Sequence, residues 1–326
     1  MDGVIEVRNV DVDFSRGKGR PALADVSLTV GGTPAITAVV GESGSGKTTL
    51  IRMLLGFQNP TRGEVLYGGR PVARLSGAAR KDFRREVQAI FQDPFEAFNP
   101  FYRVDHPLLA PLKAFGITAS REEAYHRIET ALRRVGLDPG KTLGKYPHQL
   151  SGGQRQRIMI ARALLLDPKI ILADEPVSMV DASLRSTILE ILHELNRELG
   201  ISLIYVTHDL ATAYQVADTI VVLHGGRIME VGAAEEVIQR PAHAYTRALI
   251  DAVPSPDPDK PWNLDEDPGP PRAFLPSGPT ALYATGPLRA VADAVRGGEA
   301  STTAAAIQQA VARERAAASA GSGPAG

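Results

Sequence analysis

One short segment constrains the fold of this chain more than any other: an apolar run, a glycine-rich turn and a helical pattern in direct succession. Ile36–Val40 is apolar, and residues 41–48 (GESGSGKT) follow it. They satisfy G-x-x-x-x-G-K-[ST], a motif whose context is a strand before it and a helix after it. Lys47–Phe57 predicts that helix. The order indicates an α/β fold with a phosphate-binding loop, a P-loop.

The P-loop residues suit nucleotide phosphates. Glycines let the backbone wrap closely around phosphates with its N–H groups inward, and the helix N-terminus favours anions. Lys47 would reach the β- and γ-phosphates, and the Thr48 hydroxyl would bind Mg²⁺. The alternative is a glycine-rich turn that matches by chance. The candidate ATP-binding residues of this loop are Gly41, Ser43, Gly44, Ser45, Gly46, Lys47, Thr48 and Thr49.

A second apolar run, Lys169–Ala173, ends in two carboxylates. A strand end beside the P-loop strand is where an Asp that organises Mg²⁺ belongs, and Asp174 is the candidate. Glu175 would point at the γ-phosphate and polarise the attacking water as general base. The alternative is a solvated strand end, because Asp-Glu-Pro alone is common.

Residues 150–154 (LSGGQ) predict a second anion-binding turn before a helix. Ser151 offers a hydroxyl, and Gly152 and Gly153 expose N–H groups at the helix start. One nucleotide does not need two phosphate loops from one chain, but two chains placed head to tail would need them. Gln154 completes this candidate loop.

LSGGQ after a P-loop and before a strand ending in Asp-Glu resembles the ATP-binding subunit of an ABC transporter. In that family LSGGQ of one subunit closes over ATP on the P-loop of the other. Gln92 matches the Q-loop glutamine, which contacts Mg²⁺ and water, and His208 matches the switch histidine, which contacts the γ-phosphate. Ser178 and Asp181 match the D-loop, while the residues between them depart from the usual Ser-Ala-Leu-Asp.

Aromatic side chains leave two alternatives open. The family places an aromatic under adenine where this chain has Phe14, and a core phenylalanine is the other interpretation. A cluster after Gln92 predicts either core or an exposed surface that docks a coupling helix of the transmembrane subunits. Its members are Phe95, Phe98, Phe101 and Tyr102.

A closer resemblance rests on residues 98–100 (FNP) and 242–249 (AHAYTRAL). Both are similar to the dipeptide, oligopeptide and nickel importer branch, which also includes oligosaccharide importers. The resemblance implies an Mg²⁺-dependent, peripheral ATPase at the cytoplasmic face of the cell membrane, which drives import of peptides or oligosaccharides. It also implies a second ATPase subunit (a paralogue or another copy), two permease subunits and an extracytoplasmic binding protein. The cysteines that usually follow in the branch are absent.

Two other classes are weighed: a soluble ABC ATPase of translation or DNA repair, and an exporter ATPase. The chain has one cassette and no long heptad run, which disfavours the soluble class. A formal net charge of −1 gives no indication of nucleic-acid binding. The longest charge-free stretches, Val26–Gly41 and Ala273–Leu288, contain Gly and Pro and could not span a bilayer as helices.

The expected fold is α/β: a P-loop ABC ATPase core, residues 1–253, with a β-subdomain and an inserted helical subdomain at about 95–165. Residues 254–287 hold ten of the 24 prolines and predict a linker. Residues 288–326 predict short helices, from Pro287 to Gly297 and from Thr302 to Ser319, and a frayed tail. We expect this Pro/Ala-rich extension to affect assembly or regulation rather than ATP chemistry; the alternative is an extension without a role.

Overall fold

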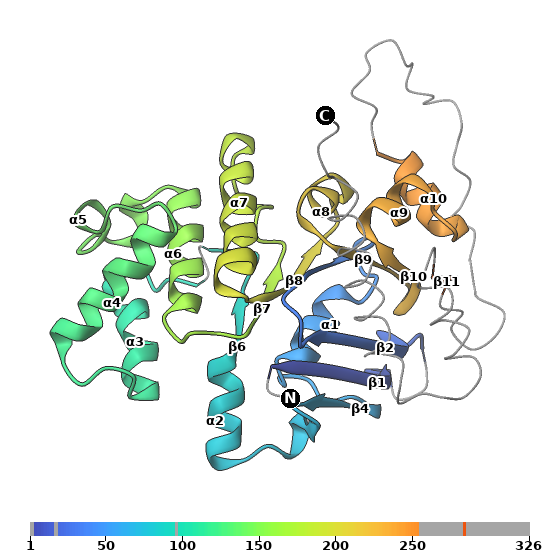
Figure 1. Ribbon diagram of the computed structural model, residues 1–326, viewed down its shortest axis with the longest axis horizontal. Helices are drawn as coiled ribbons and strands as arrows, with labels where there is room; N and C mark the ends of the chain where they lie inside the picture. Colours follow the sequence, from blue (N-terminus) through green and yellow to red (C-terminus); the bar gives the residue numbers. More distant parts are fainter. Residues whose placement is uncertain (1–2, 16–18, 95–96, 254–282, 285–326) are drawn as a thin grey trace, which may run out of the picture.

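In the computed structural model, residues 3–15, 19–94, 97–253 and 283–284 are described (Figure 1). Four strands form an antiparallel sheet in the order β2-β1-β4-β5. Along β1 the side chains of Ile5, Val7, Val10 and Val12 are buried, so one face of this sheet covers the core. The strands are β1 (Val4–Val12), β2 (Leu23–Gly31), β4 (Arg62–Tyr67) and β5 (Arg70–Pro71).

The second sheet has the order β11-β10-β9-β3-β8-β7-β6. β6, β7, β8, β3 and β9 run parallel, whereas β9 and β10 form an antiparallel hairpin. Every residue of β3, β7 and β8 is buried, which explains their continuous apolar runs. The strands are β3 (Ile36–Val40), β6 (Val87–Ile90), β7 (Ile170–Asp174), β8 (Ser202–Thr207), β9 (Thr219–His224), β10 (Arg227–Ala233) and β11 (Tyr283–Ala284).

Helices cover both faces of the parallel sheet, and Figure 1 shows α3 to α6 grouped on one side of α7, with α1 and the antiparallel sheet on the other. The α-helices are α1 (Lys47–Leu54), α2 (Gly77–Glu86), α3 (Asp105–Phe115), α4 (Arg121–Arg134), α5 (Pro139–Thr142), α6 (Gly152–Leu164), α7 (Ala182–Leu199), α8 (Leu210–Val216), α9 (Ala234–Gln239) and α10 (Ala244–Asp251). Two 3₁₀ turns are η1 (Val72–Arg74) and η2 (Pro147–Gln149).

The core has two parts, one on each face of the parallel sheet. Along β3, Ala38 and Val40 pack into one part and Val39 into the other, because successive side chains of a strand point to opposite faces. Parallel strands present their carboxyl ends at one edge, so the segments after β3, β6, β7 and β8 meet there. That edge collects the residues that the sequence predicted for nucleotide chemistry.

Several elements begin, end or turn at residues whose chemistry suits that position. The Ser120 side chain caps α4 by accepting the N–H of Glu123, and α7 ends at Gly200 with φ +66°. Gly225 and Gly226 both have positive φ, as a tight hairpin turn requires. The prediction that α1 runs to residue 57 is wrong: the helix ends at Leu54, and Gly56 turns the chain with φ +69°.

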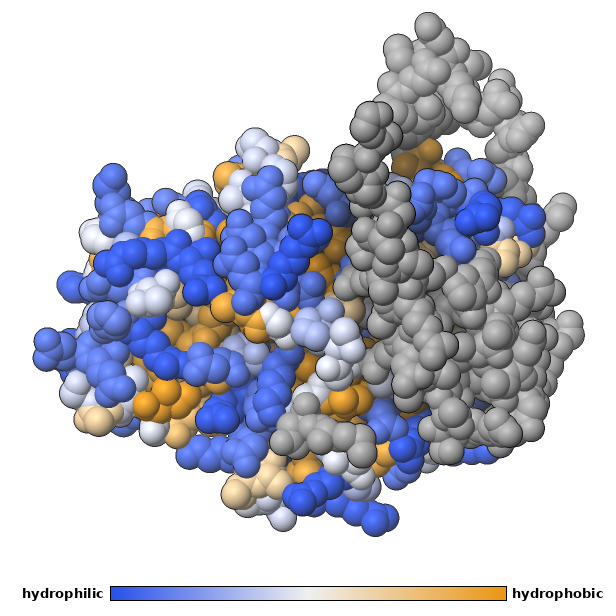
Figure 2. All heavy atoms as spheres, viewed as in Figure 1, coloured by the Kyte–Doolittle hydropathy of each residue, from blue (hydrophilic) through white to orange (hydrophobic). Residues whose placement is uncertain are grey.

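The predicted helices of the C-terminal extension lie outside the described residues, as does most of the predicted linker. Within that linker, β11 pairs in parallel with β10 through Tyr283 and Ala284, a strand that the sequence did not predict. Figure 2 shows hydrophilic side chains over much of the helical part, with smaller hydrophobic areas between them. Among the described residues, every helix is too short or too polar to cross a bilayer.

Candidate nucleotide-binding and hydrolysis site

The P-loop adopts a backbone path that needs glycine at two close approaches. Gly41 and Gly46 have φ of +156° and +108°. A Cβ at Gly41 would lie 2.0 Å from the carbonyl oxygen of Leu223, and one at Gly46 would lie 2.5 Å from that of Ala22. Side chains are therefore excluded at both positions, and the loop lies directly against neighbouring backbone.

Lys47 is the first residue of α1, and its side chain is buried inside the P-loop. Its Nζ donates hydrogen bonds to the carbonyl oxygens of Gly41 at 2.7 Å and Glu42 at 2.8 Å. Burial lowers the pKa of Lys47, and the charges of Glu175, Asp174 and Glu42 partly offset this. A bound phosphate would add further negative charge beside the Lys47 ammonium group, which has little contact with solvent.

Asp174 ends β7 with its side chain 9% exposed. Burial and the charge of Glu175 raise the pKa of Asp174, while Lys47 and Arg52 lower it. The ionised carboxylate is thus short of compensating charge, which suits a nearby cation. No group of three His, Cys, Asp or Glu side chains among the described residues could hold a metal alone. Mg²⁺ commonly binds one or two carboxylates together with substrate phosphates, so this donor set fits an ion that arrives with a nucleotide.

Glu175 is held by residues from two other strand ends. Gln92, just after β6, donates from Nε2 to Oε2 of Glu175 at 3.0 Å, and Nδ1 of His208, just after β8, lies 3.0 Å from Oε1. The sequence singled out these three residues separately, and the parallel sheet brings them together. The structure therefore fixes both oxygens of the candidate general base.

The backbone of Glu175 is strained, with φ +44° at a non-glycine residue. Its N–H donates to the carbonyl oxygen of Val206 at 2.9 Å, and its own carbonyl accepts the N–H and the hydroxyl of Ser178 at 3.2 and 2.9 Å. Ser178 of the D-loop thus holds this turn, and Asp181 takes the N-cap position of α7. Such strain persists where the surroundings over-determine the geometry, as at functional sites.

The signature loop, residues 150–154, lies elsewhere in this chain. Ser151 Oγ accepts the N–H of Gln154 at 3.2 Å, and the Gln154 side chain accepts the N–H of Ser151 at 3.0 Å, which forms a capping box on α6. A Cβ at Gly153 would lie 2.6 Å from Leu184 of α7. In Figure 1, α6 lies on the far side of α7 from α1, so the loop is placed away from this chain's own P-loop.

The aromatic alternatives separate in the structure. Phe14 is 64% exposed, so its interpretation as a core residue is wrong. Phe98 is buried in the core, whereas Phe101 is 86% exposed and Tyr102 is half-exposed against His106. Phe95 lies outside the described residues. The exposed pair follows Gln92 along the chain and is available for a partner surface.

One contact of the P-loop was missed from the sequence. The backbone N–H of Glu42 lies 3.4 Å from the hydroxyl of Tyr245, which it reaches as a donor. The segment around Tyr245 had been noted only as a mark of the importer branch. Two hundred residues separate the partners, and no local pattern indicates their contact.

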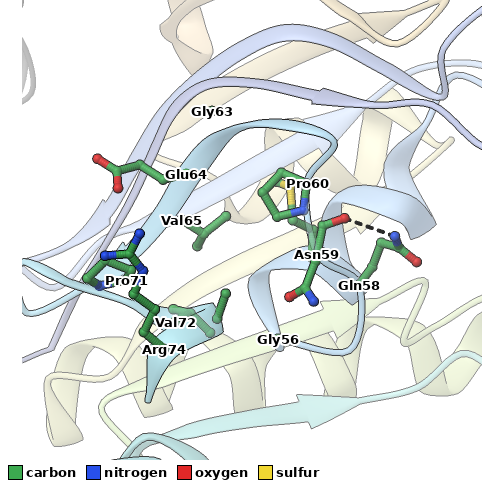
Figure 3. A pocket seen from close by; sticks show the side chains of 12 residues that line it. Gly56, Gln58, Asn59, Pro60, Gly63, Glu64, Val65, Pro71, Val72 and Arg74 are labelled. Atoms are coloured by element: carbon green, nitrogen blue, oxygen red, sulfur yellow. Dashed lines mark hydrogen bonds between the residues drawn. The ribbon is translucent and has the colours of Figure 1, made fainter. Parts of the chain in front are cut away.

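A separate pocket has a cavity volume of about 310 Å³ (Figure 3). It lies between the end of α1, the loop after it, β4 and η1, and the Gln58 side chain donates to the carbonyl oxygen of Asn59 at its rim. None of the candidate nucleotide-binding residues lines it. Its lining is Met53, Gly56, Gln58, Asn59, Pro60, Gly63, Glu64, Val65, Pro71, Val72, Ala73 and Arg74.

Comparison with known families finds two matches along the chain. The family model described as "ABC transporter" matches residues 23–178, which include the P-loop, Gln92, LSGGQ and Glu175. The model described as "Oligopeptide/dipeptide transporter, C-terminal region" matches residues 229–278. The second match includes Tyr245.

Comparison with individual proteins agrees. A Brucella ovis protein provisionally named a peptide import ATP-binding protein is 45% identical over 77% of this chain and 73% of its own length. The dipeptide transport ATP-binding protein DppF of Lactococcus lactis is 39% identical over 78% of this chain and 82% of its own. Among solved structures, a dimeric ATP-binding cassette in a post-hydrolysis state, bound to ADP and Pi, is 30% identical with a TM-score of 0.63, over 71% of this chain and 98% of that one.

Proposed function

This chain belongs to the ATP-binding subunits of ABC transporters, in the branch that imports peptides, and we propose that it drives import through a head-to-tail ATPase dimer. The chain is an ATPase subunit of the family, and its transported substrate would be a peptide or an oligosaccharide. The proposal depends on one observation above all: Gln92 and His208 both make hydrogen-bond contacts to Glu175, at the sheet edge next to the P-loop.

In the proposed mechanism, the residues of this chain bind and orient the triphosphate and handle one proton. Lys47 and the P-loop N–H groups neutralise the phosphates. Glu175 accepts the proton of the attacking water, for which each carboxylate oxygen keeps a further lone pair. His208 holds the γ-phosphate and the water in place. Phe14 stacks on adenine.

The chemistry that a magnesium ion would supply here is positive charge close to the phosphates of a bound nucleotide. Thr48, Gln92 and Asp174 are the residues that would hold it. Asp174 is the best supported of the three, because its carboxylate is buried and its pKa is raised in spite of the charges of Lys47 and Arg52. The Thr48 hydroxyl follows Lys47 at the start of α1, where the P-loop motif places its metal ligand.

The partners follow from the placement of the signature loop. A second ATPase chain, a paralogue or another copy, would bring its LSGGQ over the ATP bound here, and Ser151 would do the same for the partner's ATP. Two permease subunits would dock at the exposed Phe101 and Tyr102, and an extracytoplasmic binding protein would deliver the substrate. The subunit would then sit peripherally at the cytoplasmic face of the membrane.

We also propose that residues 1–253 are the ATPase domain, with residues 95–165 as its helical subdomain. Residues 254–326 would form a C-terminal extension. The chemistry residues all precede residue 210. A chain that ends at Val253 should therefore hydrolyse ATP at the full-length rate. A loss of hydrolysis by a folded, assembled truncation would contradict this boundary.

The experiment that tests the function co-expresses the chain with candidate permease subunits of a peptide importer. We expect the chain to co-purify with them from membranes and to hydrolyse ATP only when Mg²⁺ is present. Transport of a candidate peptide into vesicles completes the test. Hydrolysis without any association with permeases would favour a soluble ABC ATPase and refute the importer proposal.

A further inference from the structure

The P-loop is joined to the β9–β10 hairpin, which the sequence did not connect to nucleotide chemistry. The N–H of Gly226, in the hairpin turn, donates to the carbonyl oxygen of Ser45 at 2.9 Å. Gly41 lies against the carbonyl of Leu223 so closely that no side chain fits between them. The hairpin therefore supports both the start and the middle of the loop.

Tyr245 of α10 contacts the P-loop at Glu42, which lies between Gly41 and Ser45. Its side chain is buried, its hydroxyl accepts the N–H of Glu42 at 3.4 Å, and its ring packs on His224 with centroids 4.1 Å apart. Burial raises the pKa of Tyr245 to about 12, against a smaller lowering by the Glu42 backbone. The hydroxyl thus stays protonated and neutral in the cell.

The segment before Tyr245 is anchored to β10 by a fully buried carboxylate. Glu230 accepts the backbone N–H groups of Ala242 at 2.9 Å and His243 at 3.0 Å. His243 then caps α10, because its Nδ1 accepts the N–H of Tyr245 at 3.0 Å. The position of the Tyr245 ring is therefore set by the sheet rather than by α10 alone.

Glu42 links this anchored tyrosine to the catalytic lysine. Its N–H is directed at Tyr245, and its carbonyl oxygen accepts the hydrogen bond from Lys47 Nζ at 2.8 Å. A shift of Glu42 would move a carbonyl that holds the Lys47 ammonium. Tyr245 is thus coupled to the phosphate-binding cation through one residue.

We propose that Tyr245 is a positioning residue for ATP binding, which fixes the first turn of the P-loop through the backbone of Glu42. This inference rests on the proposed function, because it assumes that the P-loop binds ATP. It also gives a role to the described part of the C-terminal region that the second family model matches. Glu230, His243 and His224 are the supports of this contact.

The test is Tyr245→Phe in the full-length chain, which keeps the ring and removes the hydroxyl. We expect the Kd and KM for MgATP to rise about three- to tenfold, the range of one hydrogen bond, while kcat changes less than about twofold. The 3.4 Å length is long for such a bond, which favours the lower end. His224→Ala, which removes the packing under the ring, should raise KM in the same direction by less.

The matched control is Tyr67→Phe. Tyr67, at the end of β4 in the antiparallel sheet, also has a buried ring, and its hydroxyl bonds to Glu86 at the end of α2. Its loss should leave the affinity for MgATP unchanged, even where the unfolding temperature falls.

Two results would overturn the proposal: an unchanged Kd in both Tyr245→Phe and His224→Ala, or a fall in kcat at constant Kd. Failure of the wild-type chain to bind MgATP would instead refute the proposed function. The two failures are therefore distinguishable.

Discussion

The sheet edge that carries Glu175 and the start of α6 that carries Ser151 hold motifs of equal clarity in the sequence, but they are built differently. At the sheet edge, residues from three strand ends contact one another, with Gln92 and His208 both on Glu175. At α6, Ser151 and Gln154 bond to each other within one turn. The sheet edge is therefore assembled from distant parts of one chain, whereas the loop at the start of α6 is held by its own residues and faces outward.

The difference has a physical origin. The carboxyl ends of parallel strands converge, so long-range contacts form there within the chain. A capped helix start instead leaves backbone N–H groups directed outward, where an anion can bind. In the proposed dimer, this chain would therefore hold two unlike halves of a nucleotide site, and a second chain would complete each one.

The largest expected effect concerns Glu175 in the first region. Glu175→Gln keeps the volume and loses the base, so hydrolysis should fall about 100- to 10,000-fold while ATP binding is retained. Steady-state phosphate release and nucleotide titration measure the two quantities, and gel filtration should show a trapped dimer with ATP. Glu190→Gln, an exposed carboxylate on α7, is the control. Wild-type turnover by Glu175→Gln would show that another group is the base.

A smaller loss is expected for Lys47→Ala. Loss of one charged donor to the phosphates should lower turnover about 100- to 1,000-fold and also weaken ATP binding. The combination distinguishes it from Glu175→Gln, in which binding survives. A single-turnover assay in the assembled complex, with binding followed by titration, makes the comparison. Retained turnover would reject the P-loop assignment.

Part of the fold around the sheet edge could be predicted from the sequence alone. The strand-turn-helix around Lys47 and the strand before Asp174 were predicted, because each depends on a local apolar run and on residues with special backbone freedom. The end of α1 was wrong, because apolar residues continue past Leu54 while Gly56 breaks the helix.

What the sequence could not predict depends on long-range contact. Tyr245 meets Glu42 only because α10 packs on β10 and the turn before β10 bonds to the P-loop, and no spacing encodes that approach. The exposure of Phe14 and the burial of Phe98 were likewise open, because both residues are equally apolar and only tertiary packing separates them. The motif identified residues 150–154 as a candidate loop, but only the fold shows that this loop lies away from the P-loop of the same chain.

The third prediction concerns Ser151 in the second region. Ser151→Asp keeps an N-cap acceptor for α6 but places a negative charge where the partner's phosphates would bind, so hydrolysis should fall about 10- to 100-fold. Ser120→Asp is the matched control, because Ser120 caps α4 with the same geometry outside the site. Both variants should unfold at similar temperatures, and only Ser151→Asp should lose activity.

Mixing variants tests whether the halves join across two chains. Lys47→Ala and Ser151→Asp subunits should each hydrolyse ATP poorly alone, but a mixed dimer of two copies would hold one intact site. Random mixing should restore about a quarter of the wild-type sites. If the partner is a paralogue, the test places one change in this chain and the corresponding other change in the paralogue. No recovery in either arrangement would contradict a head-to-tail site.

The smallest expected effect concerns pH, and it compares the start of α6 with the start of α10, the helix that carries Tyr245, because the two helix caps differ in chemistry. Burial lowers the pKa of His243 below its ordinary value of 6.5; the charge of Glu230 opposes this, while His224 and Arg247 add to it. In the fold, Nδ1 of His243 must be neutral to accept the N–H of Tyr245. The hydroxyl cap of α6 at Ser151 has no such requirement.

As the pH falls below 6.5, the unfolded chain binds a proton at His243 before the folded chain does. The free energy of unfolding should therefore decrease from pH 7.5 to pH 5.5, by no more than the roughly 0.5–2 kcal/mol that a helix cap contributes. His243→Asn keeps a capping acceptor that does not titrate, so it should reduce this pH dependence, whereas His126→Asn, at an exposed histidine of α4, should not. Urea unfolding of the three chains at both pH values measures the difference. An equal pH dependence in His243→Asn and the wild-type chain would show that the cap of α10 does not respond to pH, and that the caps of α6 and α10 are alike in this respect.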